Sequence, residues 1–503
     1  MNRGDMPLTS SPRPGARRAF GAAILVLGWL SAAGIVVAEG PADLGAAASV
    51  EQAVIKAIAR AESSVVAIAR VQKPEPGRDF PLEFRPDPFG RRAVPYSSPS
   101  PTDPDFVPSQ YGTGVVVDPG GLILTANHIL GDRCDYYVTT KDRRIFAATV
   151  KGADPRSDLA VLAIQAHDLE PIVLGDVGGV RKGQIVIALG NPYAIARDGQ
   201  VSASWGIVSN LARKAPPLVD EDHPTGKSTL HHFGTLIQTD AKLNLGTSGG
   251  PLLNLQGEMI GLTTALAATA GYEQSAGYAY PVDETFCRVV DTLKRGREVE
   301  YGFLGVSPAP LSLDARLAGI HGTRLDWVVP GMPAERAGLR PGDFVTAVNG
   351  RPIYDADGLV LEVGRLPVEA TVRLTVVRDS RTLDIEAALT KYRVLGRQIV
   401  TEPAPRWRGM RVEYLSAVLD AIGRGGGGAL AFDDGVVVTH VDEASPAWEA
   451  GVRPGMLVRR VNGEPVGTPG QFRRLVRGKS GAVRLQLADS RGENPSQATV
   501  QGS

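Results

Sequence analysis

The sequence predicts a mainly β protein in which an antiparallel barrel is followed by two copies of one small module. The composition, with 59 Gly and 37 Pro among 503 residues and only 6% aromatic residues, indicates many tight turns. Short apolar runs alternate with Gly and Asn turns from Tyr111 to about Val282, which is typical of antiparallel barrels. A gapless repeat relates residues 330–353 to residues 443–466, with Arg-Pro-Gly and Val-Asn-Gly at matched positions.

Length and charge exclude several classes of protein. A chain of 503 residues is long enough for three or four domains. The 54 Lys and Arg balance the 54 Asp and Glu, so we expect no nucleic-acid partner held by bulk charge. Two cysteines, Cys134 and Cys287, cannot form a disulfide framework or a four-thiolate zinc site, and we expect both to be free thiols.

The N-terminus predicts export. Arg13, Arg17 and Arg18 precede an uncharged, mostly apolar run at residues 19–38, and Val-Val-Ala at its end resembles a cleavage site. About 20 apolar residues can also span a bilayer. Residues 1–38 are therefore either a signal peptide or a retained membrane anchor, and the pattern leaves both open. In either case we expect the rest of the chain to be exported to the periplasm or cell envelope.

Four further segments are assigned from periodicity. Residues 46–61 have helical spacing, and residues 63–71 are rich in the β-branched residues of a strand. Residues 72–110 are crowded with Pro, Ser, Asp and Arg, which predicts a long exposed loop. After the barrel, residues 283–297 read as a helix whose basic C-terminal end suits the helix dipole.

Three segments of the barrel region carry candidate chemistry. They are Thr-Ala-Asn-His at 125–128, Asp-Pro-Arg-Ser-Asp-Leu-Ala-Val at 154–161 and Gly-Thr-Ser-Gly-Gly-Pro at 246–251. A single His at a strand end is more often a packing or surface residue than a catalyst. A Ser flanked by glycines is a stronger indication of catalysis, because a tight turn can point successive N–H groups at one oxyanion. Together the segments offer a base, a group that orients it and a nucleophile.

These segments resemble the HtrA (Deg) family of trypsin-like serine proteases with C-terminal PDZ domains. The resemblance rests on YGTGVVVDPGGLILTANHIL, DPRSDLAVLAI, GNPY, LIQTDAKLNLGTSGGPLLN and GYAYPVD, and it covers residues 46–488. It implies a chymotrypsin-like double β-barrel followed by two PDZ (α+β) domains. The expected boundaries are 39–297 for the protease domain, 301–392 for the first PDZ domain and 406–490 for the second, divergent one.

The resemblance also assigns catalytic roles. Ser248 would attack the scissile carbonyl, His128 would take its proton, and Asp158 would hold the imidazole tautomer. The turn of Gly246, Thr247 and Ser248 would form the oxyanion hole through the N–H groups of its first and third residues. No metal or organic cofactor is required.

Three departures from the family pattern bear on activation and specificity. Thr247 replaces the usual Asn, or the Asp that pairs with a newly cut N-terminus in digestive enzymes, so activation of that kind is not expected. Leu245 replaces a common Pro, which leaves the oxyanion turn less fixed. Lys242 would repel a basic P1 side chain, and we expect an aliphatic P1 residue in a pocket formed by Leu243, Leu262, Thr263 and Thr264.

The PDZ resemblance predicts recognition of peptide C-termini. In the first domain the carboxylate-binding loop would contain Gly302, Phe303, Leu304 and Gly305, and the peptide would add a strand to the sheet edge. The second domain has Arg408 and Gly409 in place of the first two of these residues. Either it binds peptide poorly or differently, or Arg408 assists the carboxylate.

Two functions follow from the resemblance. One is an exported serine endopeptidase for protein quality control that degrades unfolded or misfolded envelope proteins, assembled as a homotrimer or higher oligomer. The alternative is a proteolytically silent PDZ scaffold or chaperone that kept the barrel and lost turnover. The complete set of His128, Asp158 and Ser248 favours the first.

Overall fold

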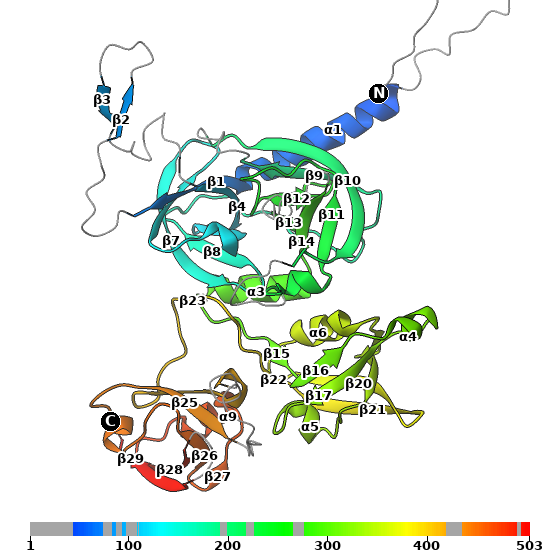
Figure 1. The fold of residues 1–503 in the computed structure, drawn as a ribbon. Helices are drawn as coiled ribbons and strands as arrows, with labels where there is room; N and C mark the ends of the chain where they lie inside the picture. The colour runs from blue at the N-terminus through cyan, green and yellow to red at the C-terminus, as the bar shows by residue number, and fades with distance from the viewer. Residues whose placement is uncertain are drawn as a thin grey trace, which may run out of the picture. The chain divides into compact units, whose positions relative to one another are not determined.

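The structure is a computed structural model that describes residues 44–73, 83–86, 93–96, 108, 110–191, 199–217, 226–264, 276–418, 435–489 and 494–502. The predicted signal or anchor segment, residues 1–38, lies outside them. Strands are the most frequent regular elements of the described residues (Figure 1). None of the helices in this part of the chain has both the length and the apolar composition needed to cross a membrane.

The first barrel is a closed sheet of six strands. Its order is β7-β6-β1-β4-β5-β8, and β8 pairs back onto β7. The strands are β1 (Val65–Gln72), β4 (Gln110–Asp118), β5 (Leu122–Ala126), β6 (Cys134–Thr139), β7 (Ile145–Asp154) and β8 (Leu159–Ala163).

The second barrel is also closed, with the order β10-β11-β14-β13-β12-β9. Its strands are β9 (Ile185–Gly190), β10 (Ser202–Arg213), β11 (Leu236–Thr239), β12 (Pro251–Leu253), β13 (Met259–Thr264) and β14 (Gly277–Pro281). The predicted chymotrypsin-like pair of barrels is therefore confirmed.

Many barrel strands are apolar on both faces, and the packing explains why. Successive side chains of a strand point to opposite sides of the sheet. Val66 of β1 and Val186 of β9 each lie in the separate core cluster of their own barrel. Their neighbours Val65 and Ile187 instead share one large cluster that draws on both barrels and on the helix after them. The near-continuous apolar runs of the sequence thus fill two cores at once.

One helix precedes the barrels in the sequence and another follows them. The helix predicted at 46–61 is α1 (Leu44–Ala61), followed by the short 3-10 helix η1 (Glu62–Ser64). The helix predicted after the barrel is α3 (Glu284–Lys294), and its N-cap Asp283 accepts a hydrogen bond from the N–H of Phe286 over 2.9 Å. Within the predicted loop 72–110, β2 (Glu83–Pro86) and β3 (Ala93–Tyr96) pair as a short hairpin that the sequence did not indicate.

The two modules after the barrels share a core order of strand, helix, two strands, helix and two strands, as the repeat predicts, and the first module has additional short elements. The first contains β15 (Gly302–Phe303), β16 (Val306–Ala309), α4 (Leu313–Leu317), β17 (Thr323–Val328), α5 (Pro333–Arg336), β18 (Phe344–Val348), β19 (Arg351–Pro352), α6 (Ala356–Gly364), β20 (Thr371–Arg378), β21 (Arg381–Ala388) and β22 (Thr390–Lys391). The second contains β24 (Met410–Tyr414), η5 (Leu415–Val418), β25 (Val436–Val441), α8 (Pro446–Glu449), β26 (Leu457–Val461), β27 (Glu464–Pro465), α9 (Pro469–Val476), β28 (Val483–Ala488) and β29 (Ser496–Val500).

The shared Val-Asn-Gly motif forms the same turn in both modules. Asn349 and Asn462 both have positive φ, at 49° and 51°, a conformation that Asn tolerates better than most residues. Each Asn side chain also accepts a hydrogen bond over 2.9 Å from a backbone N–H of the neighbouring strand, from Arg373 and Arg484 respectively. The repeat is therefore retained in structure as well as in sequence.

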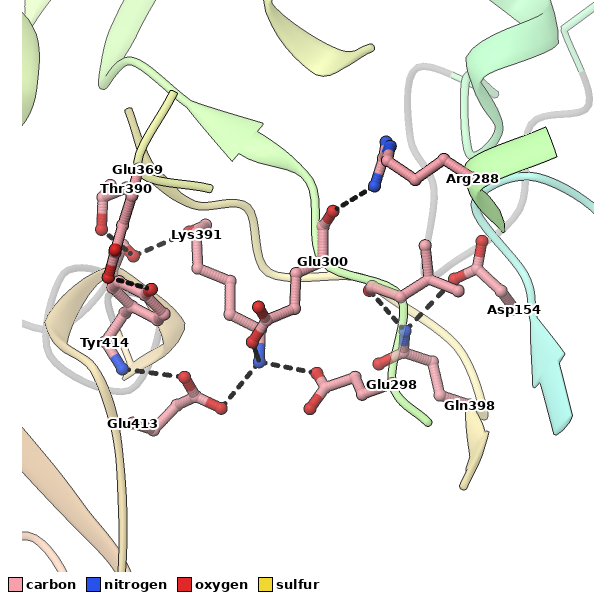
Figure 2. Close-up of polar contacts among 12 residues, drawn as sticks. Asp154, Arg288, Glu298, Glu300, Glu369, Thr390, Lys391, Gln398, Glu413 and Tyr414 are labelled. Carbon is pink, nitrogen blue, oxygen red and sulfur yellow. Dashed lines mark hydrogen bonds and ion pairs between the residues drawn. The ribbon is translucent and has the colours of Figure 1, made fainter. Parts of the chain in front are cut away.

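The segment after the first module returns to the first barrel. β23 (Ile399–Val400) pairs antiparallel with β7, opposite Ala153 and Gly152. Just before it, Gln398 donates from Nε2 to Asp154 Oδ1 over 3.2 Å, as Figure 2 shows. A sequence-distant segment thus meets the loop that leads to Asp158.

A buried lysine joins two other segments of the chain (Figure 2). Lys391 Nζ lies 2.7 Å from a carboxylate oxygen of Glu298, 3.4 Å from one of Glu300 and 2.7 Å from one of Glu413. Burial alone would lower the pKa of this ammonium, but the three carboxylates raise it well above its ordinary value. Lys391, at the end of the first module, therefore stays charged, and it pairs with Glu298 and Glu300 just before the start of the module.

Candidate active site

Strand pairing brings His128 and Asp158 together. His128 lies in η2 (Asn127–Ile129), directly after β5. β5 and β8 pair antiparallel with Ala126 opposite Leu159, so the residues just beyond this pair are neighbours. His128 Nδ1 lies 2.7 Å from Asp158 Oδ2, and the backbone N–H of His128 donates to Asp158 Oδ1 over 2.9 Å.

Asp158 has an unusual backbone conformation. Its φ is +53°, in the left-handed region that a non-glycine residue occupies only when its surroundings hold it there. Its carbonyl accepts from the N–H of Asn127 over 2.8 Å, and its side chain is buried. The conformation turns the carboxylate toward His128 at the point where β8 begins.

Three backbone carbonyls of the turn that carries Ser248 accept hydrogen bonds from neighbouring strands. The N–H of Thr113 donates to the Ser248 carbonyl over 2.9 Å. The hydroxyl of the same Thr113 donates to the Gly246 carbonyl over 2.7 Å. The hydroxyl of Thr263 donates to the Thr247 carbonyl over 2.7 Å. β4 and β13 therefore fix the nucleophile turn from two sides.

The turn needs glycine at two positions. Gly246 and Gly249 have φ of +94° and +85°, values that residues with a side chain rarely adopt. A Cβ on Gly246 would lie 2.3 Å from the carbonyl oxygen of Asn191. A Cβ on Gly249 would lie 2.4 Å from Thr125 Oγ1 and 3.2 Å from the backbone nitrogen of Ala126. The turn thus packs directly against the end of β5, the strand that leads into His128.

The two residues that depart from the family pattern in this turn differ in their environment. Leu245 is 46% exposed. Thr247 is buried, and both its hydroxyl and its N–H donate to the Asn244 carbonyl, over 2.7 and 3.1 Å. Thr247 thus closes the turn on its own backbone rather than reaching a distant partner.

Sequence reasoning missed two buried residues behind Asp158. Tyr280 of β14 donates its hydroxyl to Asp158 Oδ2. His231 of η4 (Leu230–Phe233) stacks on the Tyr280 ring with centroids 3.8 Å apart and an interplanar angle of 11°. The motif GYAYPVD contained Tyr280, but nothing in its pattern indicated a contact with a residue 122 positions earlier.

The His128–Asp158 pair has the electrostatics of a base and its orienting carboxylate. Burial would raise the pKa of Asp158, but the charge of His128 and the hydrogen bonds from His128 and Tyr280 lower it below its ordinary value. Burial would likewise lower the pKa of His128, and Asp158 more than offsets this, so the pKa of His128 is raised above 6.5. The carboxylate is therefore ionised wherever the imidazole titrates.

The raised pKa of His128 predicts the acid limb of the activity profile. A general base must be neutral, so kcat/KM should fall as the pH drops through the pKa of His128 in the free enzyme. Because that pKa lies above 6.5, the acid limb should have its midpoint above pH 6.5. Peptide hydrolysis measured from about pH 5 to about pH 9 checks this. A midpoint below pH 6.5 would contradict the pairing with an ionised Asp158.

His231 is held neutral by its surroundings. Its Nε2 lies 2.9 Å from the Ser157 carbonyl, which can only accept, so Nε2 carries the proton. Its Nδ1 lies 2.7 Å from the Thr235 hydroxyl, which therefore donates. Burial lowers the pKa of His231 to about 4, although the bond to Ser157 works in the opposite direction.

His231 should make the protease domain acid-sensitive. In the unfolded chain its pKa is near 6.5 and in the folded chain about 4, so below pH 6.5 the unfolded state binds the proton first. The free energy of unfolding should therefore fall by up to about 3 kcal/mol as the pH drops from 6.5 toward 4. His231→Phe keeps the ring stack, and its melting temperature, measured by calorimetry at both pH values, should depend less on pH. An unchanged acid dependence would show that other groups cause it.

The four residues predicted for the substrate pocket lie in different environments. Leu262 is buried in the core cluster shared by the barrels. The hydroxyl of Thr263 donates to carbonyls of the nucleophile turn, and that of Thr264 lies 3.2 Å from the Tyr280 hydroxyl. Leu243 is partly buried against the second barrel. The aliphatic P1 pocket remains a prediction.

The predicted peptide-binding loop of the first module begins with backbone bonds inside the module. Gly302 and Phe303 form β15 and pair with β22, and the N–H of Gly302 donates to the Leu366 carbonyl over 2.7 Å. The carbonyl of Gly305 accepts from the N–H of Val329, just after β17, and the carbonyl of Leu304 accepts from that of Ala334 in α5, both over 2.9 Å. Carboxylate capture by this loop remains a prediction.

In the second module the guanidinium of Arg408 is bonded to the module itself. It donates to the carbonyls of Val500, Lys479 and Gly481 over 2.6 to 2.7 Å, and it lies over the Trp407 ring, 4.7 Å from the centroid. These contacts favour the interpretation that the second module binds peptide poorly or differently, rather than with help from Arg408.

Comparison with known proteins assigns the family. A trypsin-like peptidase domain model matches residues 112–262, and a PDZ domain model matches residues 324–378 and 437–487. The chain is 32% identical over 379 residues to a probable periplasmic serine endoprotease DegP-like of Chlamydia trachomatis serovar D, covering 74% of this chain and 70% of that protein. It is 29% identical over 387 residues to the periplasmic serine endoprotease DegP of Escherichia coli K12, covering 75% of each.

A solved structure supports the fold. The HtrA-type protease AlgW with a tripeptide matches with a TM-score of 0.50 at 24% identity, covering 67% of this chain and 97% of that one. The relatives named above are periplasmic serine endoproteases, and the chain, like them, is an exported serine endopeptidase of the periplasm. The chain belongs to the HtrA (Deg) family of serine proteases.

Proposed function

We propose that the chain hydrolyses peptide bonds of misfolded envelope proteins with a triad of Ser248, His128 and Asp158. The observation that carries the proposal is the 2.7 Å contact between His128 Nδ1 and Asp158 Oδ2, next to a glycine-flanked turn that presents Ser248 against the end of β5. The domains would span 39–297 for the protease, 301–392 for the first PDZ domain and 406–490 for the second.

In this mechanism the carboxylate of Asp158 keeps the proton of His128 on Nδ1, which leaves Nε2 free to accept. Ser248 Oγ attacks the scissile carbonyl carbon while its proton moves to Nε2. The carbonyl oxygen becomes an oxyanion that the N–H groups of Gly246 and Ser248 stabilise, at about 2.7 to 4 kcal/mol per donor. His128 then gives its proton to the leaving amine as the C–N bond breaks, and water repeats the sequence on the acyl-enzyme.

Labelling with a fluorophosphonate tests the nucleophile. The wild-type protein should be labelled in its native state and not after heat denaturation, and Ser248→Ala should abolish the label. Native wild-type protein that takes up no label would overturn the triad and support the proteolytically silent scaffold instead.

A substrate pair tests the role in quality control. One disulfide-bonded protein is offered in its native form and in its reduced, unfolded form, at equal concentration. Because an extended chain is needed to fit a protease cleft, we expect the unfolded form to be cleaved and the native form to persist. Equal cleavage of both forms would contradict selectivity for misfolded proteins.

We also propose assembly as a homotrimer or a higher oligomer, supported by membership of the HtrA family. Light scattering of the chain without residues 1–38 measures the state directly. A strict monomer at micromolar concentration would contradict the proposal.

Peptide binding to the first PDZ domain should raise protease activity. The domain begins only a few residues after α3, and Tyr301 donates its hydroxyl over 2.5 Å to Asp154, in the loop that leads to Asp158. A peptide with a free hydrophobic C-terminus should raise cleavage of a short substrate about 5- to 150-fold, the usual range of allosteric coupling. The amidated peptide should lose most of this gain, because the loop then lacks its anion. Equal activation by both peptides would contradict the prediction.

A further inference from the structure

Among the described residues, one hydrogen-bond donor to the carboxylate of the predicted triad does not come from His128. Tyr280 lies on β14, where it pairs with Leu262 of β13, and its side chain is fully buried. Its hydroxyl bonds to Asp158 Oδ2, the same oxygen that contacts His128 Nδ1. An ionised carboxylate can only accept, so the phenol proton is directed at Asp158.

The donor is itself held in place on two sides. Thr264 Oγ1 lies 3.2 Å from the Tyr280 hydroxyl, so the phenol contacts both Asp158 and Thr264. The ring of Tyr280 stacks on His231, 3.8 Å between centroids. His231 in turn donates to the carbonyl of Ser157, the residue before Asp158. The Tyr280 hydroxyl therefore lies between Asp158 and Thr264, and the stack on His231 holds its ring.

We propose that Tyr280 is a positioning residue for the catalytic reaction. Its hydroxyl holds Asp158 Oδ2 in place, and Tyr280 and His128 share the negative charge of that oxygen. The inference rests on the triad proposed above. Two consequences follow. The phenol limits rotation of a carboxylate whose backbone is already in the left-handed region, and it draws charge away from the oxygen that stabilises the His128 imidazolium.

Tyr280→Phe isolates the hydroxyl, because it keeps the ring, the stack on His231 and the buried volume. We expect kcat to fall about 5- to 30-fold with KM nearly unchanged, within the energy of one hydrogen bond to a charged group. Asp158, with one donor fewer, should stabilise the imidazolium more strongly. The acid limb of the kcat/KM profile should therefore move upward, by about half a pH unit or more.

Tyr278→Phe is the matched control. Tyr278 lies on the same strand, two residues earlier and on the same face, and no hydrogen bond of its hydroxyl is recorded among the described residues. Its loss should leave the acid limb where it is. A shift of the limb in both variants would mean that the effect comes from the strand and not from the Tyr280 hydroxyl.

A double variant tests whether Tyr280 acts through Asp158. In the Asp158→Asn background, Tyr280→Phe should reduce kcat no further. A further loss equal to that in the wild type would overturn the inference, as would a Tyr280→Phe enzyme with wild-type kcat and pH profile. If Tyr280→Phe does not fold, Thr264→Val removes the second partner of the Tyr280 hydroxyl and leaves the phenol proton to Asp158 alone. It should move the acid limb downward, and an unmoved limb would overturn the inference.

The same measurements separate this inference from the triad itself. Wild-type protein that is labelled by a fluorophosphonate at Ser248 keeps the triad, whatever Tyr280→Phe does. Wild-type protein that is not labelled removes the triad, and the positioning role of Tyr280 is rejected with it.

Discussion

His128→Ala is expected to lower kcat for peptide hydrolysis about 10⁶-fold, and the double variant His128→Ala/Ser248→Ala is expected to lose little more. The reason is that Ser248 is a weak nucleophile without a neutral base in contact with it, so the second substitution removes a group that no longer contributes. Some acceleration over water should remain, from the oxyanion turn and from substrate binding. Single-turnover cleavage of a chromogenic peptide measures both variants.

His167→Ala is the control for this prediction, because His167 is an exposed histidine in the first barrel region. It should retain wild-type kcat. Losses in the two single variants that multiply in the double variant would show that His128 and Ser248 act independently, and the triad assignment would then be wrong.

Asp158→Asn should lower kcat about 10⁴-fold at neutral pH while the protein stays folded. The carboxylate accepts from the His128 backbone N–H, from His128 Nδ1 and from Tyr280, whereas an amide has a single oxygen. If that oxygen faces the backbone N–H, the amide NH₂ meets Nδ1 and drives the imidazole proton to Nε2, where it blocks proton transfer from Ser248. If the amide is flipped, its NH₂ opposes the backbone N–H.

Steady-state kinetics and melting temperature together test this variant. Asp168→Asn, at an exposed ion pair with Arg144, is the matched control and should change neither. An Asp158→Asn enzyme within tenfold of the wild type would mean that Asp158 does not set the tautomer of His128.

Local patterns were enough to predict most of the fold. The turns of the repeat depend on Asn349 and Asn462, whose conformational preference is a property of the residue and therefore visible in the sequence. The helix ending the protease region was likewise signalled by Asp283 at its start and basic residues at its end. The pairing of His128 with Asp158 followed from the order of motifs and their resemblance to a family.

What sequence reasoning could not supply were contacts made across the chain between ordinary residue types. Tyr280 and His231 occur in segments that could equally be plain core, and only closure of the second barrel brings them to Asp158. Leu262 and Thr263 were predicted to line the substrate pocket because they lie on the probable substrate strand. Which face of that strand each side chain occupies depends on register, and the side chains of both are buried.

The pairing of β23 with β7 has a consequence for where this protein can be shortened. β7 is long, and its first half pairs with β6 and its second half with β8. Among the described strands, β23 is the one that pairs with the other edge of β7 near Ala153. A chain that stops at Tyr392 retains both barrels and the first module, yet it leaves unpaired N–H and C=O groups at that edge. Such an edge is a template for strand addition between molecules, so a truncated protease of this kind would be prone to aggregate, and a chain extended through Val400 would not.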